Sequence, residues 1–185
     1  FVHGSSIGSR EVAEAPFVAT HGDRSATVTR WMEGITPPPF WAGQIRHARG
    51  YTGPVDRWQI IRFEGPCTVA IDVGVAEAGS GAPQGDRSRG VNGYVLNTIT
   101  PETETSCHYF WAFSRNYCLH EQRLTHELRE GVARIFREDE LVLEAHVEVR
   151  EPAWRADVAR GLELMLPAVV LIAEQRQAQV RRRED

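Results

Sequence analysis

Imidazole and carboxylate side chains stand next to each other at a predicted junction between a strand and a helix. In the segment SRNYCLHEQRLTHELREG (114–131), His120 and Glu121 are adjacent, and His126 follows six residues after His120. Imidazole nitrogens and a carboxylate together suit non-haem iron, and a facial set of three leaves coordination positions open. The spacing is not that of an HExxH zinc motif, because histidines six apart lie on different faces of a helix. His120 and Glu121 are therefore candidate metal ligands, whereas His126 is expected to face solvent.

Few other reactive groups occur in a pattern that predicts chemistry. His3, in FVHGSSIG, is a further candidate ligand. Every one of the 21 basic residues is arginine, which excludes lysine Schiff bases and phosphate-binding P-loops. Cys67, Cys107 and Cys118 are an odd number at wide spacing with no CxxC pattern, which suggests a reducing compartment.

The composition is that of one soluble globular domain. The chain has 185 residues, of which 42% are hydrophobic and 25% charged. Its net charge of −4 provides no basic field for nucleic acid and no attraction to an anionic membrane. No apolar run reaches transmembrane length. Nucleic-acid and membrane partners are therefore not expected.

The elements that must position the candidate ligands are strands first and helices last. Residues 1–25 are rich in Gly, Ser and Ala and predict a loop, and ITPPPFW (35–41) predicts a stiff extended segment. Strands are predicted at 26–35, in two runs on either side of Gly65-Pro66 within 56–79, at 90–100 and at 105–117. A polar, glycine-rich loop is expected at 79–90.

Two periodic patterns near the candidate ligands are informative. Alternation along 105–117 places Cys107, Tyr109, Trp111, Phe113 and Arg115 on one face and His108, Phe110, Ala112, Ser114 and Asn116 on the other. An apolar helical stripe then runs through Leu124, Leu128, Val132, Ile135 and Phe136. The segment 141–150 fits either a continuation of this helix or a short strand, and Pro167 begins a further predicted helix. This order predicts an α+β fold with an antiparallel sheet curled around a C-terminal helix.

Longer stretches of the chain resemble a known family. TPETETSCHYFWAFSRNY (100–117), followed by LREGVARIFREDELVLEA (128–145), is similar to the C-terminal catalytic domain of Rieske-type oxygenases related to the vanillate and dicamba O-demethylase oxygenase components. DRWQIIRFEGPCTVAIDVGVA (56–76) and FVHGSSIGSREVAEAP (1–16) are similar to the same group. The resemblance implies a helix-grip (START/Bet v 1-like) fold for residues 1–185 as a single catalytic domain.

The resemblance also implies a metal site. Family enzymes hold mononuclear non-haem Fe(II) with two histidines five residues apart and one aspartate, and His3 stands where the second histidine stands. The first histidine would precede residue 1. The chain begins at Phe1 without an initiator methionine, so it is expected to be truncated, with the Rieske domain and its [2Fe–2S] cluster upstream.

His120 occupies the position of the aspartate in this resemblance. Three alternatives remain open at this point. The iron could have three histidine ligands, His3 and His120 among them, which adds one positive charge and disfavours higher oxidation states. Glu121 could restore a carboxylate in place of His120. The metal site could also be lost altogether.

The family implies further residues and partners. Trp111 matches a position that helps to hold an aromatic substrate, and His108 and Asn116 are weaker candidates for substrate contacts, with Arg115 as another donor for a substrate carboxylate. The implied activity is O2-dependent O-demethylation or hydroxylation of a small aromatic compound, in a cytoplasmic bacterial enzyme. Electrons would come from NAD(P)H through a flavin and iron–sulfur reductase, and a homotrimer is expected. The altered ligand leaves a second hypothesis, a helix-grip domain that binds an apolar ligand without redox chemistry.

Overall fold

The computed structural model describes residues 7–8, 10–103 and 106–148, with backbone only for 141–148. The elements in chain order are α1 (Arg10–Glu14), β1 (Phe17–His21), β2 (Ser25–Ile35), α2 (Pro39–Arg49), β3 (Val55–Glu64), β4 (Thr68–Glu77), a 3₁₀ turn (Ala82–Gln84), β5 (Gly90–Pro101), β6 (Cys107–Arg115) and α3 (Gln122–Glu148). None of the helices in this part of the chain is both long and apolar enough to cross a bilayer.

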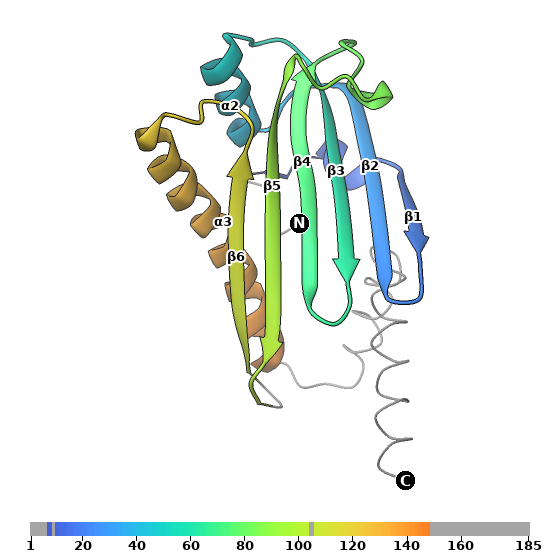
Figure 1. Cartoon of the computed structure of the whole chain (residues 1–185), viewed down its shortest axis with the longest axis vertical. Helices are drawn as coiled ribbons and strands as arrows, with labels where there is room; N and C mark the ends of the chain where they lie inside the picture. The colour runs from blue at the N-terminus through green and yellow to red at the C-terminus, as the bar shows by residue number, and fades with distance from the viewer. Residues whose placement is uncertain (1–6, 9, 104–105, 149–185) are drawn as a thin grey trace.

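The strands form one open antiparallel sheet whose spatial order is their sequence order, β1 to β6. Each strand pairs with the next, and Glu64 lies opposite Thr68 at the hairpin that contains Gly65-Pro66. Figure 1 shows this meander as a single layer, with α3 running along the β6 side and α2 beside the end at which β6 leads into α3. A sheet with one covered face buries alternate residues of each strand.

The main core lies between the sheet and the helices. Trp41 and Ile45 of α2 are buried against Val55, Val75 and Val91 of three neighbouring strands. Tyr117, Leu124 and Leu128 extend the same cluster to α3. The predicted apolar stripe is therefore confirmed, because it is the side of α3 that packs on the sheet.

A second, smaller cluster lies on the opposite face of the sheet. Trp58 and Ala76 are buried there with Ala82, and Trp31 packs against them. The Asp72 carboxylate accepts hydrogen bonds from Trp58 Nε1, Arg87 Nη1 and Asn92 Nδ2 at 2.7–2.9 Å. The Arg87 guanidinium also lies over the Trp58 ring, 4.4 Å from its centroid. This network fastens the 79–90 loop to the sheet.

The predicted α+β fold, with an antiparallel sheet followed by a long helix, is confirmed, and 141–148 continues α3. Two local predictions were wrong. The 1–25 segment contains α1 and β1, and β1 pairs with β2 from Phe17 to His21. The proline-rich segment ends β2 at Ile35 as expected, but α2 begins immediately at Pro39 because proline fits the first turn of a helix. The helix predicted from Pro167 lies outside the described residues.

Candidate functional site

The turn between β6 and α3 is built around one arginine. Arg115, the last residue of β6, donates from Nε to the Tyr117 carbonyl and from Nη2 to the Cys118 carbonyl, each at 3.0 Å. The same Nη2 reaches the Glu121 carbonyl at 3.2 Å and Thr125 Oγ1 at 2.9 Å. Cys118 has a positive φ of 46°, an uncommon backbone conformation for a residue other than glycine. The guanidinium therefore fixes the path of the turn that carries the candidate ligands.

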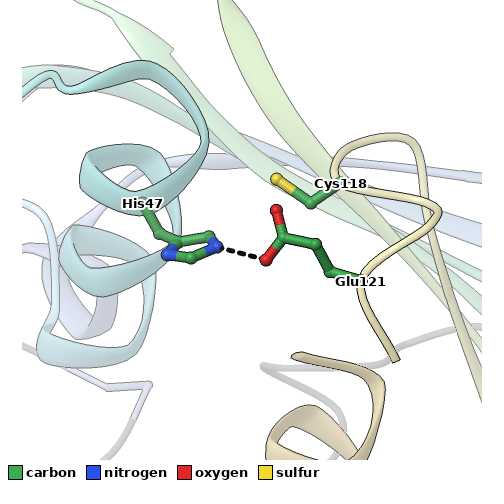
Figure 2. A group of neighbouring side chains, drawn as sticks. All are labelled: His47, Cys118 and Glu121. Atoms are coloured by element: carbon green, nitrogen blue, oxygen red, sulfur yellow. Dashed lines mark hydrogen bonds and ion pairs between the residues drawn. The ribbon is translucent and has the colours of Figure 1, made fainter. Parts of the chain in front are cut away.

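Glu121 reaches across to α2 (Figure 2). His47 Nε2 and Glu121 Oε2 are 2.7 Å apart, and the Cys118 thiol lies beside them. The ligand atoms of His47, Cys118 and Glu121 all lie within 4.8 Å of one another, and both His47 and Glu121 are exposed. Sequence reasoning missed His47, because its contact with Glu121 joins residues 74 positions apart and no local pattern marks it.

The contacts in this cluster shift the acidity of two groups. The hydrogen bond from His47 lowers the pKa of Glu121, with a further contribution from the Cys118 thiol. Burial raises the pKa of Cys118, and the hydrogen bond to the Glu121 carboxylate raises it further. Glu121 is therefore held as a carboxylate, and Cys118 as a neutral thiol.

The candidate iron ligands are only partly described. His120 is exposed, between Leu119 and Glu121 on the surface of the turn. His3 lies outside the described residues, and no group of three donor side chains within the described part of the chain includes His120. The Glu121 carboxylate is engaged with His47. The described residues alone thus do not make a three-ligand set for iron.

A groove lies between β6 and α3. Its volume is about 510 Å³, and it is lined by Tyr109, Phe110, Trp111, Phe113, Arg115, Thr125, Leu128 and Arg129. The Trp111 and Phe136 ring centroids are 5.2 Å apart, and Tyr109 meets Phe136 edge to face at 5.7 Å. Aromatic walls of this kind suit a flat apolar ligand.

The other predicted substrate contacts lie elsewhere. His108 is on the opposite face of β6, where it forms an ion pair with Glu102 at 3.5 Å. Asn116 is exposed, and its Oδ1 accepts a hydrogen bond from the backbone N–H of Asn92 at 2.9 Å. Arg115 lines the groove, but its Nε and Nη2 already donate to acceptors of the turn. Of the predicted substrate contacts His108, Trp111 and Asn116, only Trp111 lines the groove.

The described residues thus form an α+β domain, with an open antiparallel sheet, a long helix along the β6 side and an aromatic-lined groove between β6 and α3. The chain belongs to the family of vanillate O-demethylase oxygenase C-terminal domains, whose sequence model matches residues 1–185.

Individual relatives agree with this assignment. The chain is 45% identical over 146 residues to a vanillate O-demethylase oxygenase subunit of Pseudomonas sp., covering 78% of this chain and 44% of the relative. It is 33% identical to a toluene-4-sulfonate monooxygenase system iron–sulfur subunit of Comamonas testosteroni, covering 80% of this chain and 43% of that protein. The chain therefore spans less than half the length of these relatives.

A solved structure shows the same fold. The crystal structure of dicamba monooxygenase bound to dicamba superposes with a TM-score of 0.74 at 24% identity, over 98% of this chain and 52% of the other. At this identity the likeness concerns the fold alone.

Proposed function

We propose that this chain is the catalytic part of the oxygenase component of a Rieske-type monooxygenase that acts on a small aromatic compound. The reaction would be O2-dependent O-demethylation or hydroxylation. The observation that carries the proposal is the coincidence of two findings. The family match spans residues 1–185, and the groove between β6 and α3 is walled by aromatic rings, including the predicted substrate residue Trp111.

The groove supplies binding and orientation. Trp111 and Phe113 offer ring faces to an aromatic substrate, and Leu128 closes the α3 side. Binding a flat ring between these walls would fix which substituent faces the reacting centre and would remove water from it. These are the contributions that the described residues can make.

The proposal includes a mononuclear iron that, when bound, supplies the activation of dioxygen. His3 and His120 are the candidate ligands in this chain, with Glu121 as the alternative to His120. Within the described residues this ligand set is incomplete, because His3 lies outside them. The [2Fe–2S] cluster would belong to a domain outside these 185 residues. The proposal also includes a reductase that takes electrons from NAD(P)H, assembly as a homotrimer and a location in the cytoplasm.

One observation favours a second candidate function. The Glu121 carboxylate, the alternative to His120 as an iron ligand, is already paired with His47. In the family resemblance, His120 takes the position of the aspartate ligand, so the carboxylate of the iron set would be missing. A domain without a working iron site would still possess the aromatic groove. The second candidate is therefore binding of an apolar ligand without redox chemistry.

Iron analysis separates these two functions. The full-length protein would be reconstituted anaerobically with Fe(II), desalted and assayed for iron and acid-labile sulfide. The oxygenase proposal expects mononuclear iron beyond the two iron atoms of each cluster. Iron equal to the cluster content alone would leave the binding function as the explanation of the groove.

Substitution of His120 tests its role directly. If His120 occupies the ligand position, His120→Asp should raise the mononuclear iron content or the turnover, because a carboxylate restores charge balance at the metal. The control is His126→Asp, since His126 is exposed on α3 six residues away. Iron content and turnover unchanged in His120→Asp would place His120 outside the metal site.

A further inference from the structure

We propose that His47, Cys118 and Glu121 form a binding site for a divalent transition metal of the zinc class, at the corner where α2 meets the β6–α3 turn. This site includes neither His3 nor His120 of the iron set in the proposed function, and it shares with that set only Glu121, the alternative to His120. It is built by two segments that are distant in sequence and meet only in the folded domain.

The donor atoms match the chemistry of such a metal. The cluster offers one imidazole nitrogen, one sulfur and one carboxylate oxygen. Zn²⁺ accepts all three, with bonds of about 2.0–2.3 Å, which place neighbouring ligand atoms about 3.3–3.8 Å apart in a tetrahedron. The three atoms already lie within 4.8 Å of one another, and Figure 2 shows all three side chains pointing into one small space. Small side-chain adjustments, including a widening of the 2.7 Å contact between His47 and Glu121, complete the geometry.

Two features of the backbone hold the donors in place. Arg115 ties down the carbonyls of Cys118 and Glu121, so both ligand residues of the turn are fixed by one guanidinium. His47 lies in the last turn of α2, which ends at Gly50 in a left-handed cap whose amide donates to the Arg46 carbonyl. Fixed supports of this kind reduce the ordering that metal binding would require.

The site is accessible and electrically balanced. The His47 and Glu121 side chains are 50% and 47% exposed, so a metal can enter from solvent. Three protein ligands leave a fourth position for water or an external ligand. On binding, the thiol proton of Cys118 leaves to solvent, and a thiolate and a carboxylate then neutralise the two charges of the metal. The nearby Arg115 therefore faces a site with no net charge.

A metal bound here would also decide whether Glu121 can serve as an iron ligand in place of His120. Glu121 would be committed to the new site and could not replace His120 as an iron ligand. That consequence rests on the proposed function, whereas the site itself does not.

Zinc binding to the full-length protein tests the proposal. The protein, with its iron and cluster content already saturated, would be dialysed against Zn²⁺ at micromolar concentrations, and bound zinc would be counted by elemental analysis. We expect one additional zinc per chain. X-ray absorption at the zinc edge should then show one sulfur neighbour at about 2.3 Å together with nitrogen and oxygen neighbours.

Matched variants assign the ligands. Cys118→Ser and His47→Gln should each weaken zinc binding at least tenfold, and Cys118→Ser should remove the sulfur neighbour. Cys107→Ser and His126→Gln are the controls, because both residues are exposed and lie outside the cluster. No additional zinc, or zinc without a sulfur neighbour in the unsubstituted protein, would overturn the proposal without any variant having to fold. Iron content and turnover, measured separately, report on the proposed function and not on this site.

Discussion

Arginine plays opposite roles at two positions of this domain. Arg115 is satisfied by the carbonyls of the turn that it organises. Arg57, on β3, is 1% exposed, and its Nε and Nη1 have no hydrogen-bond partner among the described residues. Arg30 lies diagonally across the β2–β3 pair on the same face, since Met32 is the direct partner of Arg57. Burial, together with the charge of Arg30, lowers the pKa of Arg57 to about 10, so the side chain stays charged at neutral pH.

The buried charge predicts a stabilising substitution. Arg57→Met should increase the free energy of unfolding by about 1–3 kcal/mol, because a buried charge with unpaired donors is replaced by an apolar chain of similar length. The control is Arg62→Met, because Arg62 lies on the same strand with its side chain exposed. This substitution should change the free energy of unfolding by less than about 0.5 kcal/mol. Urea denaturation of both variants measures the difference. A destabilised Arg57→Met protein would show that an anion compensates this charge in solution.

At the scale of elements, the accuracy of sequence reasoning depended on how local the determining contacts are. The alternation along β6 and the stripe of α3 are local patterns. The alternation separated the two faces of β6, on one of which Trp111, Phe113 and Arg115 are half-buried, and the stripe predicted the face of α3 that packs on the sheet. β1 was missed because all five of its residues are exposed and only pairing with β2 defines it. α2 was missed because three consecutive prolines indicate an extended segment, although the last of them starts the helix. His47 was missed along with the helix that carries it.

The network on the outer face of the sheet predicts a pH effect. Burial alone would raise the pKa of Asp72, but hydrogen bonds from Arg87, Trp58 and Asn92 outweigh it, and the pKa falls below its usual value. A carboxyl with a lowered pKa in the folded state stabilises the fold above its unfolded pKa. That stabilisation is lost as the pH falls through the folded pKa.

Substitution of Asp72 should therefore alter the acid limb of stability. Asp72→Asn should lower the free energy of unfolding at pH 7 and should flatten its decline below about pH 4. The matched control is Asp23→Asn, because Asp23 is an exposed aspartate between β1 and β2. Urea midpoints between pH 7 and pH 3 measure the effect. An acid limb of unchanged steepness in Asp72→Asn would assign the pH dependence to other carboxyls.

The described part of the molecule is a single sheet with its main core on the face that α2 and α3 cover, and the groove exists only while α3 is docked. Leu128 belongs to both features, since it is buried in the core cluster and lines the groove. The sequence pattern predicted the helix stripe, and the family resemblance pointed to Trp111. Neither predicted the groove, because its shape depends on how far α3 stands from β6. That distance is set by the contacts of Phe136 with Tyr109 and Trp111.

Truncation of Leu128 should show how strongly the stability of the domain depends on the docking of α3. Leu128→Ala should lower the free energy of unfolding by about 2–5 kcal/mol, because it leaves a cavity in the cluster shared by α2, α3 and the sheet. Glu130→Ala, exposed on the same helix, should change it by less than about 0.5 kcal/mol. Circular dichroism reports on the helices, of which α3 is the longest described. Tryptophan fluorescence reports on strand residues such as Trp31, Trp58 and Trp111 and on Trp41 of α2, so both probes should shift together in urea if the core is one cooperative unit. A loss of helix signal at a lower urea concentration than the fluorescence change would instead show that α3 undocks from a sheet that remains folded.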